Sequence, residues 1–437
     1  MERKEFARRR KRLMNIMNIG GIAILPASQV CVRNNDVEFQ YRPDSDFYYL
    51  TGFPEPEAVA VLIPDRQHGE FILFCREKDP EMETWHGRRS GLKKAIEYYG
   101  ADDAFPITDI DEILPGLIEN KERVFYSMGT DHEFDHLVQG WVNQVRVKAR
   151  TGVTAPEEFI SLGHALHELR LFKSRGEIKA MRRAAKISSQ AHIRAMKQCH
   201  PGIKEYQIEA ELLHEFMRQG SRSPAYPSIV GGGINGCILH YTGNSDPLKD
   251  GDLLLIDAGA EHDCYASDIT RTFPINGVFS KEQKILYEIV LKAQEAAIKK
   301  VQPGNYWNEP HDTAIRELTI GLKEIGILKG RLPTLIKNEA YKPYYMHRTG
   351  HWLGMDVHDV GDYKVDGDWR ILEPGMVLTV EPGLYIKEHS RGVAKKWWNT
   401  GIRIEDDVLV TRNGNDILSK DAPKTVAEIE TIMSHAA

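Results

Sequence analysis

The sequence predicts a mixed fold in two parts, an α/β domain followed by an α+β domain built from two similar halves. The length of 437 residues favours two or three domains with ample core. Short apolar runs alternate with helical stretches in the first part, which is typical of an α/β layer domain. In the second part, the run at 251–259 returns in the same form at 375–383. We place the two domains at 1–165 and 166–437.

The elements of the first domain follow from hydrophobic periodicity. A charged amphipathic helix is expected at about 4–18, ending at Gly20-Gly21. Helical stretches such as 91–99 separate the expected strands. The β-type runs of alternating or continuous apolar residues lie at 21–25, 58–63, 70–75 and 123–126.

The second domain opens with a helix whose start is marked by a capping box. Residues 174–177 read Ser-x-x-Glu and residues 280–283 read Ser-x-x-Gln, so two helices carry the same start signal. Each helix ends at a Pro-Gly corner, at 201–202 and 303–304, and a second helix follows. Two helices and then an acid-bearing strand pair thus occur twice, which predicts two similar halves that face each other.

Four carboxylates recur in this duplicated pattern. Asp257 and Glu381 each end an apolar run, and each is followed by glycine two residues later. Asp268 and Glu405 lie on the next β-type run after each of them. An ionised acid at the end of a buried strand needs a partner, because a low dielectric penalises an isolated charge. Four such acids in one repeated pattern indicate a metal.

The first acid pair has a geometry that the sequence suggests. If a hairpin turns between residues 262 and 263, Asp257 and Asp268 lie directly opposite each other, with their Cβ atoms about 5 Å apart. Two facing carboxylates repel unless a divalent cation lies between them. The alternatives are a protonated Asp pair or ion pairs with Arg271. The second pair lies on runs too far apart to assign a register.

Histidines supply the remaining ligand chemistry. The chain contains 17 of them, so a single one carries little information. His347, His351 and His358, however, fall within one short segment, and His240 lies just before the first acid-bearing hairpin. Four histidines so placed favour a metal or catalytic site over four satisfied core side chains.

The candidate metal site consists of Asp257, Asp268, His351, Glu381 and Glu405. Two divalent cations would neutralise its four carboxylates. Oxygen-rich ligation with one imidazole suits Mn²⁺, Co²⁺ or Zn²⁺. Two metals roughly 3.5–4 Å apart can share a bridging water and lower its pKa toward neutrality. Such a site makes hydroxide for hydrolysis at an acyl carbon or at phosphorus.

Composition excludes several classes of protein. A net charge of −6 argues against nucleic-acid binding, which usually needs a basic face. The five cysteines are widely spaced and contain no C-x-x-C, which argues for a reducing compartment. No apolar run reaches the roughly 20 residues that span a bilayer, and the N-terminal segment is too polar for a signal peptide. We therefore expect a cytoplasmic protein that binds neither membrane nor nucleic acid.

At these residues the chain resembles the aminopeptidase P family, in the pita-bread group that also holds prolidase, methionine aminopeptidase and creatinase. The order Asp, Asp, His, Glu, Glu matches that family at residues 257, 268, 351, 381 and 405. The segments 45–57 and 168–173 resemble the N-terminal domain and domain junction of the bacterial enzyme. The resemblance implies a creatinase-like α/β domain followed by a pita-bread catalytic domain with a pseudo-twofold duplication.

The resemblance also implies an activity and a role for each residue. It implies removal of the first residue from peptides that begin Xaa-Pro, with two Mn²⁺ ions per subunit. Asp257 would bind one metal, His351 and Glu381 the other, and Asp268 and Glu405 would bridge them. Glu381 would be the general base, with His240 and His358 shuttling protons or stabilising the oxyanion. Substrate-binding roles would fall to His347, Tyr385, Arg403, Trp85 and Arg150.

The resemblance also implies that the protein forms an oligomer, and one loop departs from the family's pattern. The resemblance implies a homodimer or homotetramer, in which the N-terminal domain supports oligomerisation and contributes to the substrate cleft. Trp85 and Arg150 would then approach a neighbouring subunit's active site. The segment 363–370 departs from the family's pattern, so no arginine contact with substrate is carried over to it.

Two other functions compete with this prediction. A prolidase shares the metal ligands but cleaves only Xaa-Pro dipeptides, and the N-terminal motifs favour the aminopeptidase over it. A metal-free relative could use the same cleft to bind a partner. The presence of an acid or histidine at all five ligand positions argues against that alternative.

Overall fold

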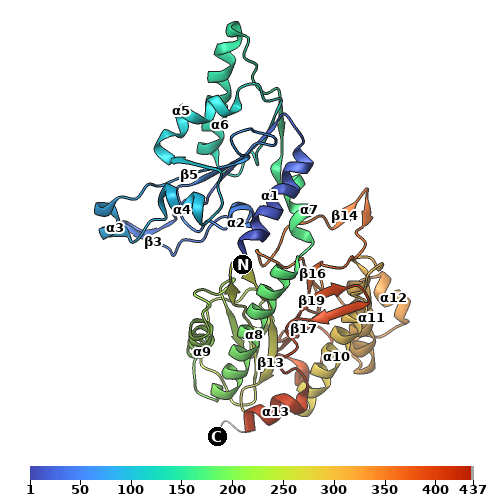
Figure 1. The fold of residues 1–437 in the computed structure, drawn as a ribbon. Coiled ribbons are helices and arrows are strands. Elements are labelled where there is room, and N and C mark those ends of the chain that lie inside the picture. Colours follow the sequence, from blue (N-terminus) through green and yellow to red (C-terminus); the bar gives the residue numbers. More distant parts are fainter. Residues whose placement is uncertain (435–437) are drawn as a thin grey trace. The chain divides into compact units, whose positions relative to one another are not determined.

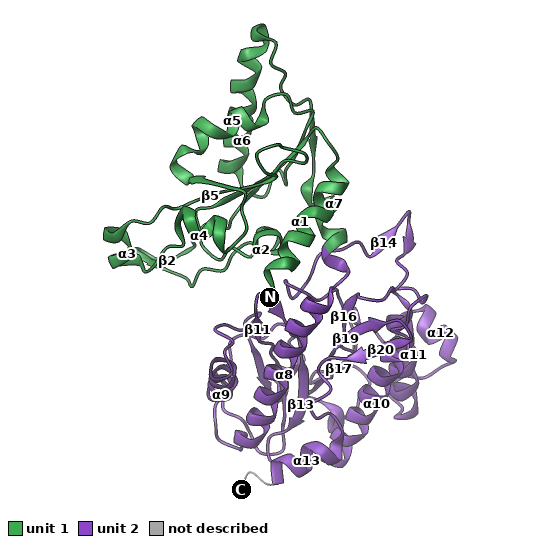
Figure 2. Cartoon of the chain, viewed as in Figure 1, with its two compact units in different colours: residues 1–169 green, residues 170–437 purple. Residues whose placement is uncertain are grey.

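The structure, a computed structural model, describes residues 1–434 and separates into two compact units (Figure 1; Figure 2). Unit 1 is Met1–Leu169 and unit 2 is Arg170–Ala437. The division falls inside helix α7 (Leu162–Leu171), shortly after the boundary predicted at residue 165. Within residues 1–434, no helix combines the length and the apolar character that a membrane crossing requires.

Unit 1 is built on one mixed six-stranded sheet. Its strands lie in the order β6 (Asp103–Pro106), β5 (Phe71–Cys75), β4 (Val59–Leu62), β1 (Gly21–Pro26), β7 (Arg123–Phe125) and β8 (Glu158–Ile160). The neighbours of β4 are antiparallel to it, whereas β5–β6, β1–β7 and β7–β8 are parallel. The four strands predicted from apolar runs are confirmed, and β6 and β8 are additional.

Helices lie before and between these strands in the sequence. They are α1 (Arg3–Met17), α2 (Ser45–Thr51), α3 (Pro80–His86), α4 (Gly91–Glu97), α5 (Ile110–Ile118) and α6 (His132–Val147), with short 3₁₀ turns η1 (Ile107–Asp109) and η2 (Lys148–Thr151) and a small hairpin of β2 (Val32–Asn34) and β3 (Val37–Glu38). Ile22 and Ile24 of β1 pack with α5 and α6, while Ala23 and Leu25 are buried on the other face. Apolar residues on both faces explain why these strands read as continuous hydrophobic runs.

The first half of unit 2 begins with a long helix. Its elements are α8 (Arg175–Gln198), α9 (Glu205–Arg218), β9 (Ile229–Gly232), η3 (Gly233–Cys237), β10 (Leu253–Asp257), β11 (Glu261–His262), β12 (Tyr265–Ala266) and β13 (Thr270–Pro274). The predicted capping box is present, because Ser174 Oγ accepts from Glu177 N and Ser174 N donates to Glu177 Oε2. Strand β10 lies between β13 and β9 in an antiparallel sheet.

The second half repeats this order with additions. Its elements are α10 (Lys281–Ile298), α11 (Glu309–Glu324), α12 (Leu332–Lys337), β14 (Lys364–Val365), β15 (Asp368–Trp369), β16 (Val377–Val380), β17 (Gly383–Ile386), η4 (Lys395–Trp397), β18 (Thr400–Arg403), β19 (Asp406–Thr411), β20 (Gly414–Ile417) and α13 (Val426–Ser434). Ser280 and Gln283 form the second predicted capping box. Helices α8 to α11 surround the strands of unit 2 in Figure 1.

The register predicted for the first hairpin is wrong by one residue at its turn. The turn residues are Asp263 and Cys264, and both have positive φ, at 52° and 61°. Positive φ at both central residues is the geometry of a type I′ turn, whose twist suits antiparallel strands. Asp257 therefore pairs with Thr270 rather than with Asp268. Asp268 becomes a diagonal neighbour of Asp257, which still leaves the two side chains on one face.

The second hairpin has the direct pairing that the sequence could not assign. Strand β16 pairs with β19 through Val380 and Asp406, and β17 pairs with β18 through Gly383 and Arg403, in one continuous register. Glu381 and Glu405 lie between these two paired segments and, in the same register, opposite each other. The second acid pair is thus opposed across the hairpin, whereas the first is diagonal.

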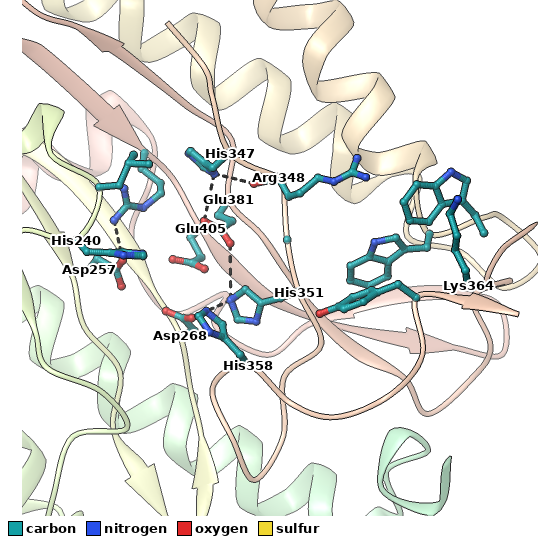
Figure 3. A pocket seen from close by; sticks show the side chains of 16 residues that line it. His240, Asp257, Asp268, His347, Arg348, His351, His358, Lys364, Glu381 and Glu405 are labelled. Carbon is teal, nitrogen blue, oxygen red and sulfur yellow. Dashed lines mark hydrogen bonds and ion pairs between the residues drawn. The ribbon is translucent and has the colours of Figure 1, made fainter. Parts of the chain in front are cut away.

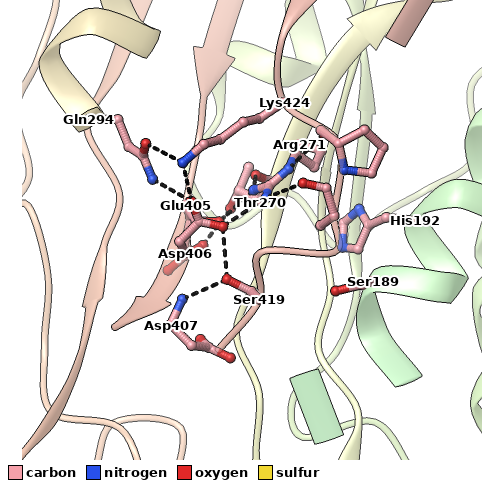
Figure 4. A network of polar contacts seen from close by, with 12 residues as sticks. Ser189, His192, Thr270, Arg271, Gln294, Glu405, Asp406, Asp407, Ser419 and Lys424 are labelled. Atoms are coloured by element: carbon pink, nitrogen blue, oxygen red, sulfur yellow. Dashed lines mark hydrogen bonds and ion pairs between the residues drawn. The ribbon is translucent and has the colours of Figure 1, made fainter. Parts of the chain in front are cut away.

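The two halves of unit 2 meet where β13 lies beside β18. Thr272 Oγ1 donates to the carbonyl of Arg403 at 3.0 Å, and Glu405 N donates to the carbonyl of Thr270 at 3.1 Å. Behind this contact lies a buried polar network centred on Asp406 and Arg271 (Figure 4). Acids from both hairpins are therefore held in one rigid frame.

Candidate metal centre

One cavity of about 670 Å³ in unit 2 brings together side chains from both halves (Figure 3). It is lined by Leu239, His240, Asp257, Asp268, Trp307, His347, Arg348, Gly350, His351, His358, Tyr363, Lys364, Trp369, Glu381, Arg403 and Glu405. All five residues predicted as metal ligands line it, as do the three other predicted histidines and Arg403. Tyr385 is buried behind the cavity and hydrogen-bonds His347.

Asp257 and Asp268 face a shared tyrosine. Tyr226 Oη donates to Asp257 Oδ1 at 2.6 Å and also contacts Asp268 Oδ1. A phenol carries one hydrogen, so it cannot donate to both carboxylates at once. Arg403 Nη2 donates to the other Asp257 oxygen at 2.7 Å. Burial raises the pKa of Asp257 against the charge of Arg403, and Asp268 raises it further.

Asp268, His351 and Glu405 form the tightest group of potential ligands. One ligand atom from each lies within 4.8 Å of the other two. His351 Nδ1 lies 2.9 Å from the carbonyl of Trp352, and since a carbonyl only accepts, Nδ1 carries the hydrogen. His351 Nε2 therefore faces the acids, 3.3 Å from Asp268 Oδ2 and 3.7 Å from Glu381 Oε1. A metal-binding histidine has this arrangement of its two nitrogens.

The electrostatics of the group call for added positive charge. Burial raises the pKa of Glu405 well above its ordinary value, and the charges of Asp268, Glu381 and Asp257 raise it further. Burial likewise raises the pKa of Glu381 to about 7. Burial acts to lower the pKa of His351, but Asp268 and Glu381 outweigh it and raise the value to about 9.

The pKa is thus raised for three acids, Asp257, Glu381 and Glu405. Burial acts to raise the pKa of Asp268 as well, but His351 outweighs it and lowers the value. The four acids therefore cannot all ionise without cations among them. Protons can supply that charge, and so can divalent metal ions. Carboxylate oxygens with one imidazole nitrogen match the donors that Mn²⁺, Co²⁺ and Zn²⁺ accept. The residues present therefore fit a metal centre.

A chain of hydrogen bonds links Arg403 to His347. Arg403 Nη1 donates to Tyr385 Oη at 2.9 Å, and His347 Nε2 lies 2.8 Å from the same hydroxyl. His347 Nδ1 lies 2.7 Å from the carbonyl of Arg348, so Nδ1 carries the hydrogen and Nε2 accepts from Tyr385. Burial and the charge of Arg403 lower the pKa of His347 to about 3. His347 is therefore a neutral, oriented imidazole.

His240 and His358 line the cavity together with His347 but are more exposed than it. Figure 3 shows His358 beside Asp268 and His351, and His240 beside Asp257. The His358 ring centroid lies 4.4 Å from that of His351. Burial and then the His351 charge lower the pKa of His358. Within residues 1–434, neither ring hydrogen-bonds another protein group, so both keep their ring nitrogens available to a ligand.

Sequence reasoning missed several residues that hold the ligands. Thr270 Oγ1 donates to Glu405 Oε2 at 2.6 Å, and the Asp407 carboxylate accepts from Asp268 N at 3.1 Å. Tyr226 reaches Asp257 from a loop before β9. The spacing of two residues between Asp268 and Thr270 was a signal for Thr270, since it places both side chains on one face of an extended segment. No spacing pattern pointed to Tyr226.

A second missed feature is the wall of the cavity on the side of the β14–β15 hairpin. It consists of Trp307, Tyr363 and Trp369 with the cations Arg348 and Lys364. Three of these five residues belong to the segment 363–370, which the family pattern did not explain. Trp307 has no sequence signal, because its neighbours in the chain are loop residues.

Trp85 and Arg150 belong to unit 1 and do not line this cavity. Trp85 lies on α3 with 77% of its surface exposed, and Arg150 is exposed on η2. An exposed tryptophan is suited to contact with a partner or ligand. Their expected approach to a neighbouring subunit stays a prediction.

Two family profiles match separate parts of the chain. The metallopeptidase family M24 matches residues 179–412, and the aminopeptidase P N-terminal domain matches residues 6–126. The chain is 46% identical to the Xaa-Pro aminopeptidase of Escherichia coli over 434 residues, covering 99% of this chain and 98% of that protein.

Solved structures agree with these matches. The aminopeptidase PepP of Pseudomonas aeruginosa superposes with a TM-score of 0.99 at 59% identity, covering 100% of this chain and 99% of that one. The zinc-substituted aminopeptidase P of E. coli in complex with product gives a TM-score of 0.97 at 45% identity, with the same coverage. The predicted fold class is confirmed, and the chain belongs to metallopeptidase family M24, with the N-terminal domain of aminopeptidase P.

Proposed function

We propose that the protein is a metal-dependent aminopeptidase that releases the first residue from peptides beginning Xaa-Pro. The relatives that match the whole chain are Xaa-Pro aminopeptidases, which favours this activity over that of a prolidase. The observation that carries the proposal is the cavity in which Asp268, His351 and Glu405 converge beside exposed histidines. A binding module has no need of such a repelling acid cluster.

We propose two divalent ions, with Mn²⁺ as the metal that the family resemblance favours. Asp257 would hold one ion, His351 and Glu381 the other, and Asp268 and Glu405 would bridge. The carboxylates from both halves and the inward Nε2 of His351 support this arrangement. When bound, the ions would lower the pKa of water so that it becomes a nucleophile near neutral pH.

Glu381 is proposed as the general base. Its carboxylate lines the cavity, and Glu381 Oε1 lies 3.7 Å from His351 Nε2, among the proposed ligands. Its position between the β16–β19 and β17–β18 ladders holds the carboxylate at the cavity without a flexible loop. Glu381 can therefore accept a proton from attacking water at a fixed place.

His240 and His358 are proposed to serve the scissile amide. The amide before proline carries no N–H, so its nitrogen leaves only after receiving a proton. Both histidines line the cavity and form no hydrogen bond with another group of residues 1–434, so they can donate to the oxyanion or the leaving nitrogen. His347, held neutral by Tyr385 and Arg403, presents a rigid surface for the proline side of the substrate.

The remaining proposals concern assembly and location. We propose a homodimer or homotetramer in which Trp85 and Arg150 approach a neighbour's cleft, a role that the exposure of both supports. We also propose a cytoplasmic location. Within the described residues, Cys31, Cys75, Cys199 and Cys237 form no disulfide, as is usual in a reducing compartment.

The activity is tested by comparing Gly-Pro with Gly-Pro-Gly-Gly after loading the purified protein with Mn²⁺. We expect release of glycine from the tetrapeptide, measured by chromatography of the products. Metal removal with a chelator should stop the reaction, and re-addition should restore it. Cleavage of the dipeptide alone would instead establish a prolidase.

Replacing His358 by Ala is expected to lower kcat by about 10²-fold or more while the metal content stays unchanged. The reason is the loss of a donor to the oxyanion or leaving group. Steady-state kinetics and metal analysis of the same sample give the two readouts. His214→Ala is the matched control, because His214 is exposed on α9 and outside the cavity. Loss of metal in His358→Ala would move His358 into the ligand set.

A further inference from the structure

We infer that the cavity contains a subsite for a carboxylate of the peptide beyond its proline, formed by Arg348 and Lys364 over Trp369. This inference rests on the proposed function, since it concerns the same substrate in the same cavity. It names a substrate class, namely Xaa-Pro peptides with an anionic group downstream of the cleaved bond.

The subsite is built on the β14–β15 hairpin. Lys364 and Trp369 are cross-strand partners in that hairpin, and Lys364 Nζ lies 4.7 Å from the Trp369 ring centroid. Arg348 Cζ lies 5.0 Å from the same centroid. Contact with an indole orients both cations without neutralising them. The two charges are thus gathered at one place on the cavity wall.

Neither cation has a charge partner of its own. Among residues 1–434, the Arg348 guanidinium and the Lys364 ammonium form no ion pair with a carboxylate, and both side chains are exposed. An anion beside either cation is attracted to a charge that no carboxylate of residues 1–434 neutralises. A guanidinium binds a carboxylate in bidentate fashion, which gives such a site selectivity as well as affinity.

Aromatic packing makes this wall rigid. The ring centroids of Trp307 and Tyr363 lie 4.7 Å apart, and Tyr363 stacks on Trp352 at 5.7 Å with an interplanar angle of 5°. Trp307 and Tyr363 line the cavity with Trp369. Their faces offer apolar surface for the peptide that leads to the two cations. A rigid wall loses little entropy when it binds a chain.

The polarity of the cavity sets the direction of the peptide. In Figure 3, Arg348 points away from the cluster of Glu381, Glu405 and His351, and Lys364 lies still farther from it. The acids lie at the side where the cationic N-terminus of a substrate belongs. The anionic part of the peptide therefore belongs at Arg348 and Lys364. Either the C-terminal carboxylate of a short peptide or an acidic side chain can supply it.

Four peptides separate these two sources. Ala-Pro-Ala is compared with Ala-Pro-Ala-NH₂, and Ala-Pro-Glu-NH₂ with Ala-Pro-Gln-NH₂, by kcat/KM at low salt with the Mn²⁺-loaded protein. Each pair differs only in one carboxylate. We expect the carboxylate to raise kcat/KM about tenfold in at least one pair. This is the change that one hydrogen bond between charged groups produces. The pair that responds identifies the source.

Substitutions of the two cations then test whether they cause the preference for a carboxylate. Arg348→Met and Lys364→Met should each bring the responding ratio to within about threefold of unity. Arg316→Met, which removes an exposed arginine from α11 outside the cavity, should keep the ratio. Ratios below twofold in the wild type, or ratios unchanged in both cavity variants, would refute the subsite while the aminopeptidase activity stands. Failure to cleave any of the four peptides would refute the proposed function and the subsite with it.

Discussion

Replacing Asp268 by Asn or Glu405 by Gln is expected to abolish peptide hydrolysis, with a loss in kcat of well over 100-fold. Substituting a residue that only hydrogen-bonds a metal ligand lowers metal affinity or activity by about 10- to 100-fold. The loss of a bridging carboxylate should therefore lower activity further. Both residues belong to the group whose ligand atoms lie within 4.8 Å of one another. An amide keeps the size of the side chain but removes the charge that holds a cation.

Three measurements distinguish this outcome from misfolding. Metal content should fall, kcat should fall with it, and the thermal unfolding midpoint of metal-free Glu405→Gln should stay the same or rise. The rise is expected because the acids repel one another, a repulsion that raises the pKa of Glu405. Asp421→Asn, an exposed carboxylate outside the cavity, is the control. A variant that keeps most of its kcat and all of its metal would exclude the bridging role.

Replacing Asp406 by Asn is expected to destabilise unit 2 by about 3–5 kcal/mol, the range for breaking a buried ion pair on one side. Asp406 is fully buried, with Arg271 Nη2 at 2.7 Å from Oδ1 and Lys424 Nζ at 2.7 Å from Oδ2 (Figure 4). Gln294 Nε2 donates to Oδ2 and Ser419 Oγ donates to Oδ1. The substitution leaves the Arg271 and Lys424 charges without their anion.

Urea unfolding followed by circular dichroism measures this loss. Asp416→Asn is the matched control, since Asp416 pairs with Arg182 at a partly exposed site where an ion pair is worth at most about 1 kcal/mol. The two variants should differ by several kcal/mol in the free energy of unfolding. Equal stabilities would show that the buried network contributes no more than a surface pair.

The same residue predicts a pH dependence of stability. Burial acts to raise the pKa of Asp406, but Arg271 and Lys424 outweigh it and hold the pKa well below its ordinary value. A depressed pKa in the folded state gives stability that is complete above the unfolded value, near 4, and is lost as the pH falls below it. The wild type should therefore lose stability below about pH 5 more steeply than Asp406→Asn.

Two features of the site were accessible to sequence reasoning because they are local. Asp257 and Glu381 end apolar runs flanked by glycine, and a charged group at such a place needs a partner whatever the fold. The three histidines from 347 to 358 occupy one short segment. Residue type and spacing along one strand were enough to predict these candidate ligands.

Sequence reasoning could not predict the register of the first hairpin or which side chains from distant segments contact the acids. The turn at Asp263 and Cys264 depends on two positive φ angles, which sequence patterns predict poorly when glycine is absent. The shift moves Asp268 from a direct to a diagonal position opposite Asp257. Tyr226 and Thr270 reach the acids through contacts between segments that are distant in the chain or between the two halves.

The sequence by itself determined the family, the two-part fold and the chemical nature of the candidate ligands, because these depend on residue type and on spacing within single elements. Only the tertiary structure decided how the acids pair and which residues hold them. It also placed the Arg348 and Lys364 charges together at Trp369. Those features depend on the packing of one segment against another, and packing is a property of the whole fold rather than of any one stretch of chain.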